Sequence, residues 1–121
     1  GGFTASYWTD DIDQKKFNRA RLFGEVDTSK PFIEWNGNSY PHRTYDWTKA
    51  IPKGSTVIVG HDRSPFCEVP AFESNINEIV TSTNDLGGTV IFTDTGAGKG
   101  GFVSGVVIDS DGIVQDTVVF D

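Results

Sequence analysis

Residues 89–101 read TVIFTDTGAGKGG, a short apolar run that passes directly into a polar, glycine-dense loop. A continuous apolar run of this length, bounded by turn residues, predicts a buried strand over residues 89–92. Asp94 follows the strand end, where its carboxylate can orient a ligand. The glycines between residues 96 and 101 let backbone approach closely and turn N–H groups toward an anion. Alternatively, these glycines serve only to form a tight turn.

Residues 56–62 read TVIVGHD and repeat this arrangement. A second strand, also expected to be buried on both faces, ends at Gly60 and is followed by His61 and Asp62. In layered α/β sheets, ligands gather where the strands end. Because neutral imidazole is a common metal ligand, His61 is a candidate metal ligand. A loop histidine bonded to a backbone group remains the alternative.

The C-terminal part of the chain, residues 51–121, predicts further sheet structure. Two more strands are expected, at residues 102–108 and 114–120. The sequence DSDG at residues 109–112 joins them and is typical of a hairpin turn. A short helix is expected around residues 74–80. The expected core consists of Val57, Val59, Val90, Phe92, Val103, Val106, Ile108, Val118 and Phe120.

The first part, residues 1–50, reads as irregular with one helix. Asp11 or Asp13 can cap a helix that ends near Gly24, because a carboxylate accepts the free N–H groups of a first turn. Asn-Gly at residues 36–37 follows a short apolar run and predicts a small hairpin. Three large side chains are expected to anchor the segment that follows: Tyr45, Trp47 and Ile51. Together these patterns predict an α/β (α+β) fold: a mixed sheet with one or two helices.

Composition restricts the classes of partner and compartment. The chain has 121 residues and a net charge of -7, so nucleic acid is disfavoured as a partner because its phosphates repel an acidic surface. The lone Cys67 cannot form an internal disulfide, which fits the cytoplasm. The sequence has no apolar stretch of about 20 residues, so no membrane span is expected. The chain begins with Gly1-Gly2 and contains no methionine, as expected for part of a longer polypeptide.

The two strand-to-loop motifs resemble a known signature. Gly-His at a strand end, followed by DTGAGKGG at residues 94–101, is similar to the C-terminal signature of calcineurin-like metallophosphoesterases. The resemblance is to the group with the Ser/Thr protein phosphatases, the symmetrical diadenosine tetraphosphatases and the phosphatase module of bacterial polynucleotide kinase–phosphatases. LFGE at residues 22–25 looks like that group's LYGE, and RTYDW at residues 43–47 looks like its R-x-x-W segment.

The resemblance implies an αββα sandwich that binds two divalent metal ions, with manganese favoured and iron, zinc or nickel as alternatives. Such ions hold a hydroxide and clamp the charge of the phosphate under attack. Carried over by position, His61 is a metal ligand and Asp94 is a catalytic residue beside the site. The resemblance also places a group of residues in the loops around the substrate: Gly60, Asp62, Gly96, Gly100 and Gly101.

The chain also departs from the family pattern. The motifs D-x-H, G-D-x-x-D and G-N-H-D/E, which supply most metal ligands in this family, are absent. The resemblance therefore implies a complementary N-terminal half that contributes these ligands, and an isolated chain that is inactive. Asp62 stands where Thr or Ala is common in the family, so the phosphorylated substrate stays open. A phosphoprotein, a dinucleotide polyphosphate and a small phosphomonoester all remain candidates.

Two functions from other classes compete with this interpretation. Asp94-Thr95-Gly96 matches the catalytic triplet of aspartic proteases, in which two carboxyl groups share a proton. The triplet lies late in this chain, however, whereas in those proteases it lies early. Alternatively, the chain is a non-catalytic binding or structural module that retains the loops of the phosphoesterase fold.

Overall fold

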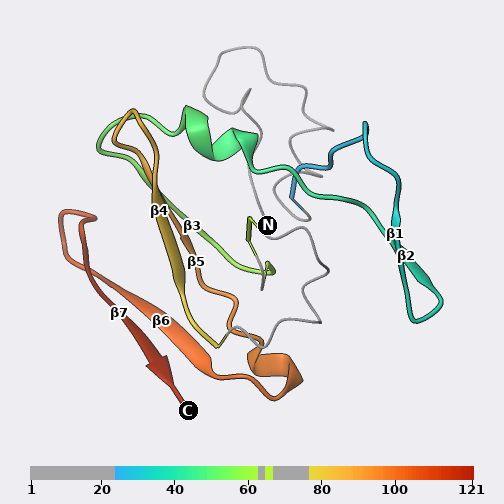
Figure 1. The fold of residues 1–121 in the computed structure, drawn as a ribbon. Helices are drawn as coiled ribbons and strands as arrows, with labels where there is room; N and C mark the ends of the chain where they lie inside the picture. The colour runs from blue at the N-terminus through green and yellow to red at the C-terminus, as the bar shows by residue number, and fades with distance from the viewer. Residues whose placement is uncertain (1–23, 63–64, 67–76) are drawn as a thin grey trace.

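The computed structural model describes residues 24–62, 65–66 and 77–121. Within these ranges the chain forms seven strands in three small sheets, two short 3-10 helices and no α-helix (Figure 1). The predicted α/β class is therefore wrong, and the described part is a mostly-β domain. The elements are β1 (Ile33–Trp35), β2 (Asn38–Tyr40), η2 (Asp46–Ala50), β3 (Thr56–Val59), β4 (Val80–Thr83), β5 (Thr89–Phe92), η4 (Ala97–Lys99), β6 (Val103–Ile108) and β7 (Val114–Phe120).

The central sheet has the strand order β3-β5-β4. Strand β5 pairs in parallel with β3 and antiparallel with β4, so this sheet is mixed. The register places Phe92 opposite both Val59 and Val80. Because β3 and β5 run in the same direction, the loops that follow them leave the sheet at the same edge.

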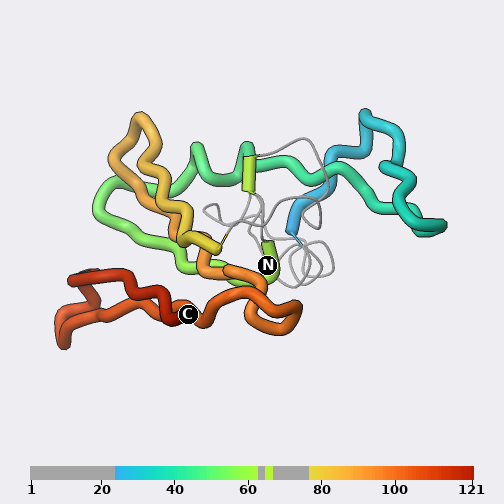
Figure 2. The backbone as a smooth tube through the Cα atoms, turned by 60° about the horizontal axis from the view of Figure 1, so that its bottom comes forward, coloured from blue at the N-terminus to red at the C-terminus, as the bar shows by residue number. Residues whose placement is uncertain are grey.

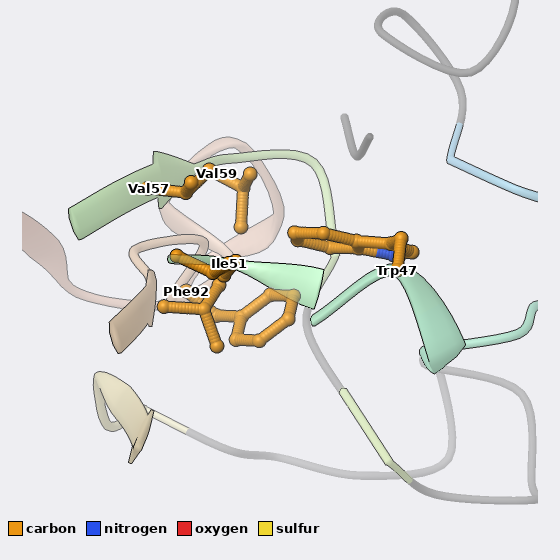
Figure 3. Close-up of a cluster of buried hydrophobic side chains, with 6 residues drawn as sticks. Trp47, Ile51, Val57, Val59 and Phe92 are labelled. Carbon is orange, nitrogen blue, oxygen red and sulfur yellow. The ribbon is translucent and has the colours of Figure 1, made fainter. Parts of the chain in front are cut away.

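The hydrophobic core covers one face of this sheet (Figure 3). The predicted core residues Val57, Val59, Val90 and Phe92 are buried there, against Trp47 and Ile51. The rings of Trp47 and Phe92 lie 6.2 Å apart, centroid to centroid. The predicted anchoring by Trp47 and Ile51 is thus confirmed. Burial of each such side chain contributes about 1.5–3 kcal/mol.

Strand β3 differs from its prediction because it is buried on one face only. Val57 and Val59 are buried, whereas the alternate residues Thr56 and Ile58 are exposed, Ile58 by 40%. The neighbouring β5 is buried at Val90, Ile91 and Phe92, as its continuous apolar run predicted. The difference follows from position, since β5 is the middle strand and β3 lies at the edge.

The predicted hairpin of β6 and β7 is confirmed, and it forms a separate two-stranded layer below the central sheet (Figure 2). The side chain of Asp109 accepts the N–H groups of Asp111 and Ile113 in its turn, and Gly112 has a positive φ. The predicted burial of this hairpin is wrong. Val103, Ile108 and Phe120 are 58%, 48% and 61% exposed. Val106 and Val118 are only partly buried.

This discrepancy has a physical reason. An apolar run predicts burial only where a second layer covers it. In the described part of the chain the hairpin pairs with no third strand. Residues directly opposite each other in the register, such as Val103 and Phe120, share a face of the ribbon. The hairpin therefore presents apolar side chains that the described residues leave partly uncovered.

Strand β4 occupies sequence for which a helix was expected. Val80 begins this strand and residues 77–79 are not helical, so the predicted helix is wrong from residue 77 onward. The β-branched residues of VTST suit a strand, and β5 supplies a pairing partner. Residues 74–76 lie outside the described residues. So does the helix predicted between Asp11 and Gly24, except for Gly24 itself.

The small N-terminal hairpin is confirmed as β1 and β2, with Asn36 and Gly37 both at positive φ in the turn.

Near the central sheet, the side chain of Asn84 ties the β4–β5 turn to η2. Its amide nitrogen donates to the carbonyl oxygens of Thr48 and Ile51 at 2.8 and 2.9 Å. Its amide oxygen accepts the N–H groups of Leu86 and Gly88 at 3.0 and 2.8 Å.

Among the residues that the structure describes, none forms a helix that could span a membrane.

We predict that Asn84→Ala lowers the free energy of unfolding by about 1–3 kcal/mol, because it leaves partly buried backbone groups without partners. Urea unfolding, followed by tryptophan fluorescence, measures this loss. Asn38→Ala on the exposed strand β2 is the matched control and should change stability by less than about 0.5 kcal/mol. Equal effects of both variants would contradict a special role for Asn84.

Candidate functional site

The two predicted motifs meet at one edge of the central sheet. Residues 60–62 follow β3, residues 93–96 follow β5, and the two strands are parallel neighbours. Thr93 links the two strand ends directly, since its N–H and its hydroxyl both donate to the carbonyl oxygen of Val59 at 2.8 and 3.0 Å. The structure therefore brings the segments of His61 and Asp94 to the same side of the fold.

Asp62 is a buried carboxylate with partners inside the protein. Its side chain is 8% exposed. The hydroxyl of Tyr45 donates to its Oδ2 at 2.5 Å, and Nη1 of Arg43 lies 3.5 Å from the same oxygen. Burial raises the pKa of Tyr45. The hydrogen bond to Asp62 and the negative charge of the Asp62 carboxylate raise this pKa further. Asp62 thus joins the β3 loop to the segment before η2, whereas the sequence placed it in a loop around substrate.

His61 is exposed at the end of β3 and has an unusual backbone. Its φ is 66°, in the left-handed region that non-glycine residues rarely occupy. Its carbonyl oxygen accepts a hydrogen bond from Nη1 of Arg43 at 3.4 Å. The preceding Gly60 is also exposed, and a Cβ on it would meet nothing within 4 Å.

Asp94 begins a tightly turned loop. Its Oδ1 accepts the N–H of Gly96 at 2.8 Å, and the hydroxyl of the buried Thr95 donates to the carbonyl oxygen of Phe102. Gly96 and Gly100 both have positive φ. The carbonyl oxygen of Gly96 accepts the N–H groups at residues 99 and 101, at 2.8 and 2.9 Å.

These contacts show what the glycines do in the fold. A Cβ at Gly101 would lie 2.2 Å from the carbonyl oxygen of Thr95, so this position admits no side chain. Positive φ at Gly96 and Gly100 likewise favours glycine. Because the N–H groups of residues 99 and 101 already have an acceptor within the loop, they are not directed at an anion. The interpretation of these glycines as turn formers accounts for the contacts of this loop.

The described residues provide part of a metal-ligand set at most. They contain no group of three or more His, Cys, Asp or Glu side chains arranged to hold one ion. His61 offers an exposed imidazole, Oδ2 of Asp62 is engaged by Tyr45 and Arg43, and Oδ1 of Asp94 is engaged by the Gly96 N–H. The imidazole of His61 and the carboxylate of Asp94 are the candidate donor groups in these two segments.

Two surface hollows lie away from this edge. One, of about 510 Å³, lies between the start of β4 and the end of β7 and includes Glu78, Phe102 and Asp121. The other, of about 460 Å³, lies between β7 and the face of the central sheet opposite the core, and includes Thr89 and Ile91. Neither is lined by His61, Asp62 or Asp94.

Arg43 and Tyr45 both contact Asp62 at this site, a role that the sequence did not predict for them. Both belong to RTYDW, but Arg43 served only as part of a resemblance and Tyr45 only as a hydrophobic anchor. Their spacing carried a signal, because residues two apart in an extended segment point to the same side. Their partner, Asp62, is 17 residues beyond Tyr45, so no local pattern identifies the pair.

Comparison with known proteins gives no relative. No protein-family model, no curated protein and no solved structure matches this chain. The motifs and their positions in the fold are therefore the basis of any functional proposal.

We predict that Gly101→Ala lowers the free energy of unfolding by about 1–3 kcal/mol, since the loop must move to relieve the clash with Thr95. Gly98→Ala is the control in the same loop, because a Cβ there would meet nothing within 4 Å. Urea unfolding of both variants tests the comparison. A Gly101→Ala protein as stable as Gly98→Ala would show that the loop does not close as described.

Proposed function

We propose that this chain takes part in metal-dependent phosphoester hydrolysis as the C-terminal part of a calcineurin-like metallophosphoesterase. One observation carries the proposal: the parallel pairing of β3 with β5, which puts the Gly-His motif and the DTGAGKGG motif at one edge of a sheet. In open α/β sheets, sites form where the carboxyl ends of parallel strands meet, and the β3–β5 pair reproduces that local arrangement in a mostly-β domain. Two motifs that separately have structural explanations are here in a position to act together.

His61 is proposed as a metal ligand and Asp94 as the carboxylate beside it. Imidazole and carboxylate ligands suit manganese, iron, zinc and nickel. When bound, such ions activate water and stabilise the charge that develops on a phosphoryl group. The chain's own residues hold the ligand-bearing segments in place: Thr93 joins the two strand ends, and the Gly96 N–H holds one oxygen of Asp94.

A complementary N-terminal half is proposed as the source of the remaining ligands. The described residues contain no group of three or more His, Cys, Asp or Glu side chains placed to hold one ion, and two ions require more donors than His61 and Asp94 provide. Charge supports a metal-assisted site as well. A chain with a net charge of -7 repels a phosphorylated substrate unless cations at the site offset that repulsion.

A non-catalytic module is the second candidate, and the contacts of Asp62 favour it. This carboxylate is committed to Tyr45 and Arg43, and the N–H groups of residues 99 and 101 are committed to Gly96. A fold that retained these loops for their structural contacts alone would show the same bonds. The two candidates differ in whether metal and substrate turnover depend on His61.

We predict that the chain alone shows negligible hydrolysis of p-nitrophenyl phosphate. Supplied with its complementary N-terminal half and Mn²⁺, it should hydrolyse this substrate. His61→Ala in the reconstituted protein should lower bound metal, measured by elemental analysis, and kcat/KM by about tenfold or more, because a ligand is lost.

His42→Ala is the matched control, because His42 is the other histidine of the chain and follows strand β2 at a distance in sequence from both motifs. It should leave metal content and rate unchanged. Wild-type metal content and rate in His61→Ala would refute the ligand role. Metal-independent hydrolysis of peptides at acid pH would instead favour the aspartic protease alternative.

A further inference from the structure

We infer that the buried carboxylate of Asp62 is an anchor that holds His61 in its left-handed backbone conformation, and thereby sets the direction in which the imidazole leaves the sheet edge. Asp62 is in this view a positioning residue, which acts through its neighbour. The conformational inference stands independently of the proposed function. Only its consequence for metal binding rests on that proposal.

The conformation of His61 needs external support. At a φ of 66°, the Cβ of His61 crowds its own backbone and raises the conformational energy. Glycine has no Cβ and avoids this cost. A non-glycine residue keeps such a conformation only when its surroundings determine it. Glycine adopts a positive φ at little cost, yet the positive φ in this loop falls on His61 and not on the adjacent Gly60.

The support comes from both sides of the peptide that joins His61 to Asp62. Nη1 of Arg43 lies 3.4 Å from the carbonyl oxygen of His61 and 3.5 Å from Oδ2 of Asp62. The same guanidinium nitrogen therefore contacts the carbonyl of one residue and the side chain of the next. These contacts fix the peptide that follows His61, and the pairing of β3 with β5 fixes the chain just before Gly60, so the dihedral angles of His61 are restricted from both ends.

Tyr45 completes the anchor. Its hydroxyl lies 2.5 Å from Oδ2 of Asp62, a short bond to an ionised acceptor. A buried carboxylate is costly unless it is paired and hydrogen-bonded, and here the guanidinium and the phenol supply both kinds of partner. Loss of either partner would expose Asp62 to that cost and loosen its position.

The anchor is itself attached to fixed parts of the fold. Arg43 forms a backbone bridge with Val26, and the N–H of Thr44 donates to the carbonyl oxygen of Glu25 at 2.9 Å. The ring of Tyr45 packs against the buried Phe92, with centroids 5.9 Å apart. Because Phe92 ends β5, the anchor connects the loop after β3 with the end of the strand that leads to Asp94.

The test uses the full chain and a readout specific to His61. The three-bond coupling between the α proton of His61 and the preceding carbonyl carbon, together with the Cα chemical shift, reports φ of His61 by NMR. In Asp62→Ala we expect these values to shift toward those of ordinary negative φ, while the amide shifts of β4 and β7 stay as in the wild type. A folded Asp62→Ala with wild-type values at His61 would overturn the inference.

Asp46→Asn is the matched control. Asp46 is exposed and pairs with Lys49 at 3.2 Å, so its substitution also removes an ion pair, but one that includes none of Arg43, Tyr45 and Asp62. The values at His61 should be unchanged in this variant. A shift at His61 equal to that in Asp62→Ala would overturn the specific role of Asp62.

Two further variants protect the test against misfolding. If Asp62→Ala does not fold, Tyr45→Phe decides, because it keeps the carboxylate and removes the hydroxyl that donates to it. It should shift the His61 values in the same direction, and unchanged values would overturn the inference. With Asp62 in place, His61→Gly should raise the urea midpoint, because glycine accepts at little cost the positive φ that the anchor imposes on His61. No such gain would count against the anchor.

The consequence for metal binding is tested separately. In the reconstituted protein, Asp62→Ala should weaken Mn²⁺ binding by about tenfold or more, as loss of a residue that orients a ligand does in known sites. If the His61 values shift but no Mn²⁺ binds to the wild type, the anchor stands and the proposed function fails. If Mn²⁺ binds equally well to wild type and variant, the positioning role is overturned while the function stands.

Discussion

The parallel pairing of β3 with β5 is the constraint on which the arrangement of this protein depends. Parallel neighbours require a crossover, because the chain must return to the starting edge before the second strand begins. Here β4 lies within that connection and pairs with the far side of β5. Strand β5 is thus bonded on both sides, and its Val90 and Phe92 are among the most buried residues. Reversal of either strand would separate the two polar loops.

Two polar side chains, the half-buried Asn84 and the buried Asp62, then fix what the sheet alone leaves free. Asn84 binds the carbonyl oxygens of Thr48 and Ile51 and so holds η2 to the β4–β5 turn. Asp62 binds Tyr45 and Arg43 and so holds the loop after β3. Both cases follow the same rule: a buried polar group must be satisfied, and groups that satisfy it become tied to one another. The core and these polar contacts together define the edge that carries His61.

The sequence predicted the features that depend on local pattern. The apolar runs identified β3, β5, β6 and β7, and Asn36-Gly37 and Gly112 identified two turns, because turn chemistry is contained in a few neighbouring residues. Strand β4 was missed because its alternating residues carry only one aliphatic side chain, Val80, and its pairing with β5 is not a local property.

Burial and partnership were less predictable for the same reason. The exposure of Val103 and Phe120 depends on what covers the hairpin, and the contacts of Asp62 depend on residues 17 or more positions away. For the candidate site, the sequence correctly predicted the strands that lead to His61 and Asp94, whereas the roles of these two residues stay predictions. The sequence did not predict that Tyr45 and Arg43 bind Asp62. It also predicted that N–H groups of the glycine loop face an anion, whereas those of residues 99 and 101 bond within the loop.

We propose that the ends of β3 and β5 together form one metal-binding edge of the central sheet. Paramagnetic broadening of the chain's backbone amide resonances by Mn²⁺, measured in the protein reconstituted with its complementary N-terminal half, tests this arrangement, because broadening depends steeply on distance from the ion. The account predicts that amides of residues 60–62 and 93–96 broaden together, and that His61→Ala abolishes the effect. Broadening of one segment without the other, or broadening confined to the acidic turn at residues 109–112, would contradict it.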